Sequence, residues 1–65
     1  KDFKDRIRHL CAALKSPYRE VALEHFCEEK TAAEIAKAQN KNTKTVQTQI
    51  YRARSMLKAL LERSD

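Results

Sequence analysis

Hydrophobic residues recur along this chain at spacings of three and four, with polar residues between them. This period is typical of amphipathic helices, whereas the apolar residues of a half-buried strand alternate. The pattern predicts four helices, at about residues 2–14, 17–28, 31–39 and 43–62. We therefore expect an all-α domain.

Two of the predicted helices have well-defined apolar faces. In the first helix this face contains Phe3, Ile7, Leu10, Cys11 and Leu14. In the last helix it contains Val46, Ile50, Ala53, Leu57 and Leu60. Because these residues share one side of each helix, we expect both faces to pack into one small core.

Local signals mark the starts of the second and third helices. Ser16 precedes Pro17, and a serine cap followed by a proline in the first turn is typical of a helix start. Thr31 is followed three residues later by Glu34. This pair predicts a capping box, in which the two side chains satisfy free backbone amides at the helix start.

A polar turn separates the last two predicted helices. Asn40 is the residue best suited to a left-handed turn, because asparagine tolerates positive φ. Asn42 or Thr43 then caps the last helix. Two helices joined in this way form a helix-turn-helix, so we expect a four-helix domain with a C-terminal helix-turn-helix and without winged elements.

The last helix also presents a polar strip on the side opposite its apolar face. At 1.5 Å per residue this helix is about 30 Å long. The strip contains Lys44, Thr48, Tyr51 and Ser55, flanked by Gln47, Arg52 and Lys58. We interpret it as a surface that meets DNA, the alternative being an ordinary solvated helix face.

Composition narrows the possible functions. The chain has 65 residues, no glycine and one proline, and a chain of this length has no room for a buried catalytic cleft. Since no nucleophile, base and orienting residue form a recognisable set, we do not expect an enzyme.

No apolar run reaches the ~20 residues that span a bilayer, so we expect a cytoplasmic protein without membrane contact. Because residue 1 is Lys rather than Met, we expect residues 1–65 to be a single domain from a longer chain.

The net charge of +5 belongs entirely to the second half of the chain. Residues 1–29 carry six cations and six anions, whereas residues 30–65 carry eight cations and three anions. A basic face gathered on one motif is expected of a protein that neutralises DNA phosphates.

Two His-x-Cys pairs, His9 with Cys11 and His25 with Cys27, raise the question of a metal site. Residues two apart on a helix point about 200° apart, so neither pair can close on one ion. We expect no metal and no cofactor, and we expect both cysteines to be small buried hydrophobes. A disulfide between them is compatible with their spacing, but a reducing cytoplasm disfavours it.

The ordered set of motifs resembles region 4 of bacterial RNA polymerase sigma factors, most closely the extracytoplasmic-function type. The residues that carry the resemblance are Pro17-Tyr18-Arg19-Glu20-Val21, Thr31-Ala32-Ala33-Glu34-Ile35-Ala36, Thr45-Val46 and Tyr51-Arg52-Ala53-Arg54 with Leu57. Domains of that family recognise the upstream, minus-thirty-five promoter element and dock on the flap of the polymerase β subunit. The resemblance therefore implies three partners: double-stranded promoter DNA, the RNA polymerase core and an anti-sigma factor.

The resemblance also implies roles for individual side chains. The family's base-contacting positions fall on Gln47, Thr48 and Tyr51. Glutamine pairs with the N6 and N7 edge of adenine, and a threonine methyl or a tyrosine ring packs on a thymine methyl. The residues suited to phosphates are Lys44, Arg52, Arg54 and Lys58, together with Lys30 and Thr31 at the start of the third helix.

Two other functions stay open beside promoter recognition. One is a response-regulator-like helix-turn-helix regulator; these usually add a separate dimerisation helix, whereas here the pattern is uninterrupted from Thr43 to Leu61. The other is a protein-interaction module that binds polymerase or an anti-sigma factor, with vestigial DNA contact. Neutral Gln47 and Gln49, where the resembling family often has cations, favour this module.

Overall fold

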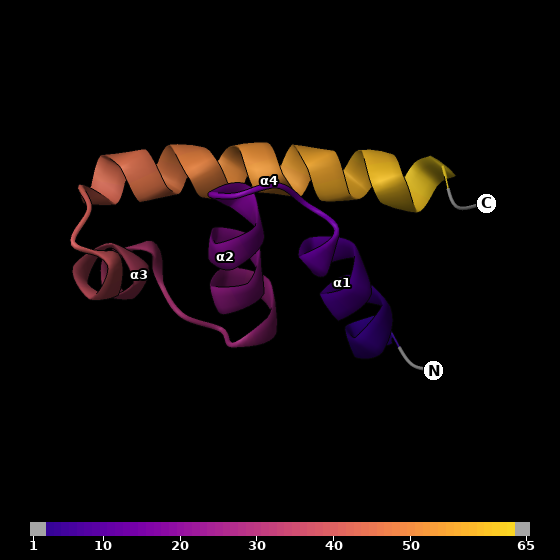
Figure 1. Cartoon of the computed structure of the whole chain (residues 1–65), viewed down its shortest axis with the longest axis horizontal. Coiled ribbons are helices and arrows are strands. Elements are labelled where there is room, and N and C mark those ends of the chain that lie inside the picture. The colour runs from indigo at the N-terminus through magenta and orange to yellow at the C-terminus, as the bar shows by residue number, and fades with distance from the viewer. Residues whose placement is uncertain (1–2, 64–65) are drawn as a thin grey trace.

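The computed structural model describes residues 3–63. The helices are α1 (Phe3–Ala12), α2 (Tyr18–Ala22), η1 (Leu23–Cys27), α3 (Ala32–Gln39) and α4 (Thr43–Arg63). α4 lies along one side of the molecule, and α1, α2 and α3 lie in a row against it (Figure 1). Residues 3–63 contain no β-strand. The predicted all-α, four-helix class is confirmed, with the second helix divided into α2 and η1.

The division of the second helix is a departure from the regular helix that periodicity predicted. Its second half, η1, is a π-helix, in which the Glu28 N–H donates to the Leu23 carbonyl five residues earlier at 3.1 Å. The wider π turn reduces the angle between successive side chains. Ala22, Phe26 and Cys27 all reach the same apolar cluster as a result.

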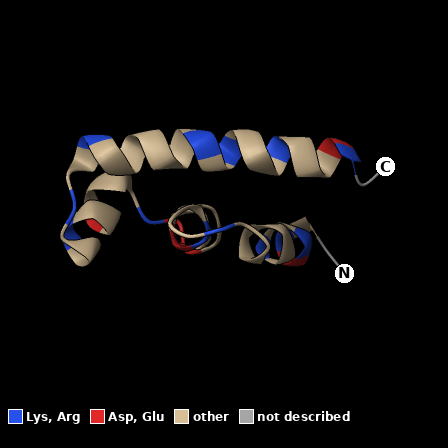
Figure 2. Ribbon diagram, turned by 45° about the horizontal axis from the view of Figure 1, so that its top comes forward, with Lys and Arg blue, Asp and Glu red and all other residues tan. Residues whose placement is uncertain are grey.

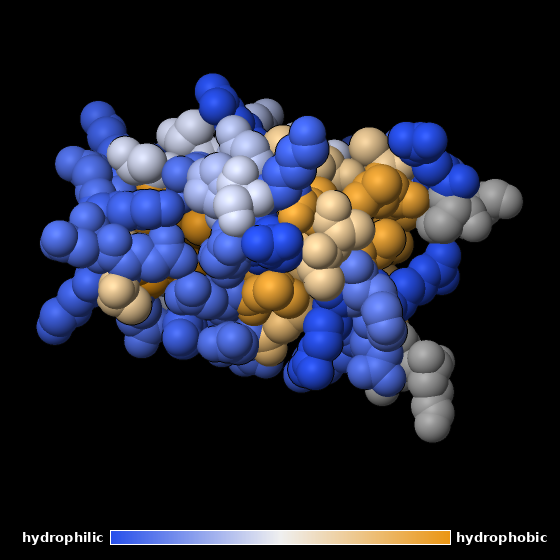
Figure 3. Space-filling view, in the orientation of Figure 1, coloured by the Kyte–Doolittle hydropathy of each residue, from blue (hydrophilic) through white to orange (hydrophobic). Residues whose placement is uncertain are grey.

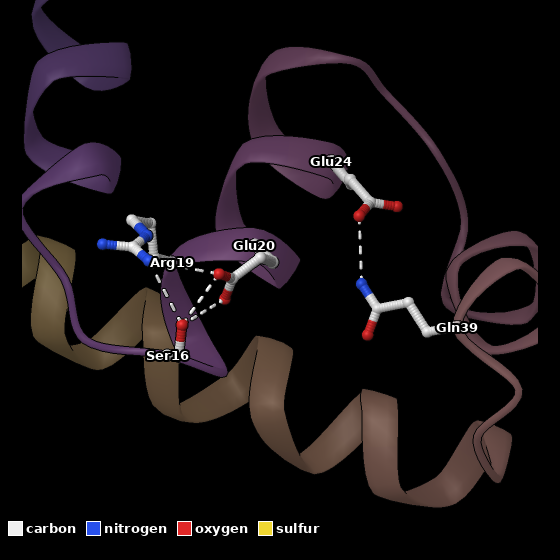
Figure 4. Close-up of polar contacts among 5 residues, drawn as sticks. All are labelled: Ser16, Arg19, Glu20, Glu24 and Gln39. Carbon is white, nitrogen blue, oxygen red and sulfur yellow. Dashed lines mark hydrogen bonds and ion pairs between the residues drawn. The ribbon is translucent and has the colours of Figure 1, made fainter.

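The start of α2 corrects a second prediction. Pro17 occupies the N-cap position, and no side chain caps the helix. The Ser16 hydroxyl donates instead to the Glu20 carboxylate, at 2.7 and 2.9 Å, and accepts from Arg19 Nη2 at 3.3 Å (Figure 4). The hydrogen bond from Ser16 is the main cause of a lowered Glu20 pKa, and Arg19 lowers this pKa further. Ser16 thus marks the helix start by binding a carboxylate rather than a backbone amide.

The other helix boundaries lie within two residues of those predicted. α1 ends at Ala12 rather than at residue 14, because the amides of Ala13 and Leu14 donate to carbonyls three residues earlier, each at 3.1 Å. Residue 2, the predicted start of this helix, lies outside the described residues. α4 ends at Arg63, one residue beyond the prediction.

The capping box and the turn between α3 and α4 agree with the sequence. The Thr31 hydroxyl accepts from the Glu34 N–H at 3.1 Å, and the Glu34 carboxylate accepts from the Thr31 N–H at 2.8 Å. Asn40 has a φ of 55° and ends α3 in the left-handed conformation. Asn42 then caps α4 by accepting from the Lys44 N–H at 2.8 Å.

Two apolar clusters hold the shorter helices against α4. The first cluster joins α2, α3 and α4 through the buried residues Val21, Ile35, Ala36 and Val46. The second cluster joins α1, α2 and α4 through the buried residues Cys11, Leu14, Ala22, Ala53 and Leu57. The predicted apolar face of α4 is therefore the shared wall of both clusters, and the helix-turn-helix has a core of its own.

Glu29 offers a test of the backbone between η1 and α3. Its φ of 60° lies in the left-handed region, which costs a residue with a Cβ atom about 1–2 kcal/mol. Its ion pair with Lys4, at 3.8 Å, is highly exposed and contributes little. We expect Glu29→Gly to raise the free energy of unfolding by about 0.5–1 kcal/mol, after the flexibility cost of glycine, as measured by urea denaturation.

The neighbouring residue Glu28 supplies the matched control. Its φ of −101° is allowed for any residue without strain. Glu28→Gly therefore relieves no strain and adds only the flexibility cost of glycine, so it should lower the free energy of unfolding. If Glu29→Gly is equally destabilising, the left-handed backbone at Glu29 does not limit stability.

Candidate nucleic-acid interface

The amino-terminal half of α4 presents its polar side chains away from the core. Gln47, Thr48 and Tyr51 are all exposed and lie together, with Lys44 and Thr45, around a shallow surface depression. Tyr51 is 70% exposed. We call Gln47, Thr48 and Tyr51 the reading patch. The structure therefore brings the three predicted base-contacting residues together on one surface.

Thr48 has only part of its hydrogen-bonding capacity left for a ligand. Its hydroxyl donates to the Lys44 carbonyl one turn earlier, at 3.1 Å. Since the hydroxyl proton is used inside the helix, the side chain offers a methyl group and an acceptor oxygen. A methyl group suits the C5-methyl of thymine. The bond therefore favours an apolar contact by Thr48 over a donated hydrogen bond.

Four of the predicted phosphate-contacting residues are on α4, and they divide between two surfaces. Lys44 belongs to the surface around the reading patch, and Arg52 is exposed on the flank of the helix. Arg54 and Lys58 line a separate groove nearer the end of the helix. Figure 2 shows the cations spread along α4, where the single acidic residue is Glu62. The structure thus does not gather these four cations around one DNA-facing patch.

Lys30, predicted to contact phosphate, is already paired with carboxylates. Its Nζ lies 3.2 Å from Glu28 and 3.8 Å from Glu24. The hydrogen bond and charge of Glu28 raise the Lys30 pKa most, and Glu24 adds a smaller effect. Glu24 also accepts from Gln39 Nε2 at 3.0 Å, which ties the second helix to α3 (Figure 4). A DNA phosphate at Lys30 must therefore compete with two anions of the protein itself.

Thr31 is similarly engaged at the start of α3. Its hydroxyl oxygen and its backbone N–H both take part in the capping box with Glu34. The hydroxyl proton stays available to a phosphate oxygen, but the Glu34 carboxylate already occupies the positive end of the helix dipole. Thr31 is therefore a weaker anion site than an uncapped helix start.

Gln49 faces the protein rather than the reading patch. The side chain is partly buried, and its Oε1 atom is buried without a hydrogen-bond partner. A neutral residue at this position therefore says little about the affinity of the domain for DNA. Of the two neutral glutamines, only Gln47 still supports the interpretation that the DNA contact is vestigial.

A second candidate site is an apolar groove between α1 and the carboxyl-terminal half of α4. Its volume is about 530 Å³, and its lining residues are Phe3, Lys4, Ile7, Arg8, Phe26, Cys27, Arg54, Leu57, Lys58 and Leu61. Figure 3 shows apolar residues reaching the surface at this end of the molecule, whereas the α3 end is hydrophilic. The lining combines an apolar floor with four cations and no acidic residue.

The residues that line this groove were not predicted from the sequence. Phe3 was predicted to face the core because of its position in the helical repeat, yet it is 67% exposed and lines the groove. Position in the repeat shows which side of α1 is apolar, but not how far the partner helix extends along it. An apolar residue at the end of such a face, such as Phe3, is the only sign that the sequence offered.

The family model for sigma-70, region 4, matches residues 4–57. The chain belongs to this family. The matched part of this region 4 domain includes α3, the turn, α4 as far as Leu57 and the whole reading patch. Neither the curated proteins nor the solved structures that were compared with the chain gave a match.

Membership of this family gives the domain a coarse function. Sigma-70 region 4 is a DNA-binding helix-turn-helix domain that acts in promoter recognition and interacts with RNA polymerase. Among residues 3–63, no helix is long and apolar enough to span a membrane. Over the same residues, no three His, Cys, Asp or Glu side chains come together in a group that could hold a metal ion.

The pairing of Lys30 can be tested by removing its nearer anion. In Glu28→Gln, Lys30 gains freedom to contact a phosphate, and one added contact should make the slope of log affinity against log salt more negative by about 0.9. Fluorescence anisotropy with a short duplex across a salt series measures this slope. Glu62→Gln, at the far end of α4, changes the net charge equally and should leave the slope near that of the wild type. Equal slopes in both variants would exclude Lys30 as a phosphate contact.

Proposed function

We propose that this region 4 domain reads the minus-thirty-five promoter element with α4, as part of a sigma factor of the extracytoplasmic-function type. The observation that carries the proposal is the reading patch on the first half of α4. Val46, on the opposite side of the same turns, is fully buried against Val21 and Ile35. A recognition helix places its amino-terminal residues against base edges in the major groove. The buried side of α4 thus holds the patch in a fixed orientation for such contacts.

The chemistry of the patch suits a short element that contains A·T pairs. Gln47 matches the N6 and N7 edge of adenine, and Thr48 and Tyr51 match the thymine methyl. A good bidentate base contact contributes about 1–3 kcal/mol of discrimination. Two or three such contacts make a weak binder, so tethering to polymerase is needed to raise the effective concentration of the domain at the promoter.

The groove is the surface that we propose for the β flap of RNA polymerase. Its apolar floor suits buried side chains of a partner segment, with Phe3 as an exposed aromatic anchor. Of its four cations, Lys4 is paired with Glu29, and Arg8, Arg54 and Lys58 favour a partner that carries acidic residues. Arg54 and Lys58 therefore serve the polymerase in this proposal rather than phosphates. An anti-sigma factor that occupied the same groove would compete with the flap.

Base reading and phosphate binding can be separated by two substitutions on α4. Gln47→Ala should relax the preference at one base pair with nearly unchanged salt dependence, whereas Arg52→Ala should weaken binding to every duplex alike. Anisotropy with a panel of duplexes that differ at single base pairs measures both effects. The reversed pattern would refute these roles.

The methyl contact by Thr48 has a test of its own on the DNA side. Replacement of thymine by deoxyuridine removes only the C5-methyl group and keeps base pairing. At one position of the element this replacement should weaken binding of the wild type but not of Thr48→Ser, which has no methyl group. Equal losses in both proteins would assign the thymine methyl to another residue, with Tyr51 as the next candidate.

The two exposed aromatic residues separate the DNA site from the polymerase site. Phe3→Ser should weaken binding to a purified β flap domain by about tenfold and leave duplex binding unchanged. Tyr51→Ala should have the opposite effect. Because both residues are largely exposed, neither change should unfold the domain, which circular dichroism checks. If both variants keep duplex affinity but lose flap affinity, the chain is a protein-interaction module.

A further inference from the structure

We propose that Cys11 and Cys27 form a reversible disulfide that regulates the groove. The regulatory half of this inference rests on the proposed polymerase function of the groove, whereas the thiol pair itself does not. The pair joins α1 to the end of η1, the two elements that meet at one wall of the groove.

The two thiols are already neighbours in the fold. Cys11 is completely buried in the second cluster, and Cys27 packs against the same cluster while it also lines the groove. Cys27 packs from η1 against the cluster in which Cys11 is buried, and α1 and η1 are in direct contact. Both cysteines are free thiols, and the proximity of Cys27 contributes to the raised pKa of Cys11. An S–S bond of about 2.05 Å therefore requires a local approach of neighbouring side chains and no rearrangement of distant elements.

The π turn of η1 accounts for this proximity. Cys27 follows Ala22 by five residues, which in a regular α-helix at 100° per residue would turn it about 140° away. The wider turn of η1 reduces that angle, so that Cys27 and Ala22 contact the same cluster as Cys11. π turns of this kind occur frequently at functional sites.

The two cysteines differ in reactivity. Burial, followed by the proximity of Cys27, raises the pKa of Cys11 to about 11. Cys11 is therefore protonated at neutral pH and, being buried, meets no reagent directly. Cys27 is partly exposed in the groove. An oxidant from solution thus reaches Cys27 first, and Cys11 is placed to resolve the product.

The oxidant required is a low-molecular-weight disulfide. The Cys27 thiolate attacks one of its sulfurs, the S–S bond of the reagent breaks, and one small thiolate leaves. Cys11 then loses its proton and attacks Cys27 Sγ in the mixed disulfide, which releases the second small thiolate. In total the two protein thiols lose two electrons and two protons, and the reagent gains them as two thiols. A dithiol reductant reverses the reaction.

The disulfide changes the groove but not the reading patch. Bonding draws Cys27 Sγ out of the groove wall towards Cys11 and fixes the end of η1, including Phe26, against α1. The reading patch belongs to the part of α4 held by the first cluster, which contains neither cysteine. We therefore expect oxidation to lower affinity for the β flap by about tenfold and to leave affinity for a duplex unchanged.

Mass spectrometry of the whole chain under native conditions tests the thiol pair. The wild type, treated with glutathione disulfide, should lose two hydrogen atoms without retaining glutathione, and peptide mapping should join Cys11 to Cys27. Cys11→Ala should stop at one glutathione adduct on Cys27, and Cys27→Ser should stay unmodified because Cys11 is buried. Accumulation of the adduct in the wild type, or disulfide-linked dimers, would overturn the pairing.

Binding measurements on the same samples test the regulation. Oxidised wild type should bind the purified β flap domain about tenfold more weakly than reduced wild type, and dithiothreitol should restore binding, while Cys27→Ser should respond to neither treatment. Equal flap affinities of the oxidised and reduced wild type would overturn the proposal that the disulfide regulates binding at the groove. If the reduced wild type does not bind the flap, the proposed function of the groove fails. Mass spectrometry still shows in that case whether Cys11 and Cys27 form a disulfide.

Discussion

The packing of α4 against the three shorter helices is the interaction on which the rest of the structure depends. Val46, Ala53 and Leu57 are buried in succession along this helix, and full burial of a valine or leucine side chain contributes about 1.5–3 kcal/mol. Ala53 meets Ala22 in the same cluster, and two small residues allow α4 and α2 to approach closely. A chain of 65 residues buries only ~60% of its unfolded surface. Both apolar clusters of residues 3–63 include side chains of α4, so neither cluster could hold the shorter helices if this contact were lost.

One helix therefore positions two surfaces of different chemistry. The first cluster lies behind the reading patch, at the polar end of the molecule, and the second cluster lies beside the apolar groove. Separate clusters allow the groove to change while the reading patch keeps its geometry. This division suits the proposed function, in which a weak contact with DNA gains strength from a second contact with polymerase.

Charge in the folded domain is distributed differently from charge along the chain. The net charge of +5 belongs to the second half of the sequence, yet Lys30 is paired with Glu24 and Glu28 from the first half. Arg54 and Lys58 line the groove instead of the reading patch. Of the predicted phosphate-contacting cations, Lys44 and Arg52 are left in the amino-terminal half of α4, which carries the reading patch. Fewer phosphate contacts mean lower affinity and a smaller salt dependence, which agrees with a domain that works in a larger assembly.

The sequence by itself determined the four helices, the capping box of Thr31 and Glu34, and the left-handed turn at Asn40. Each of these features depends on residues within about one helical turn of one another, so local spacing and side-chain chemistry are sufficient to predict it. The reading patch also follows from the sequence, because one helical repeat relates its members. Only the tertiary structure decided the π turn of η1, the exposure of Phe3, the pairing of Lys30 and the placement of Cys11 and Cys27 at one apolar cluster. These features depend on where surfaces from distant segments meet, and the period of a single helix does not contain that information.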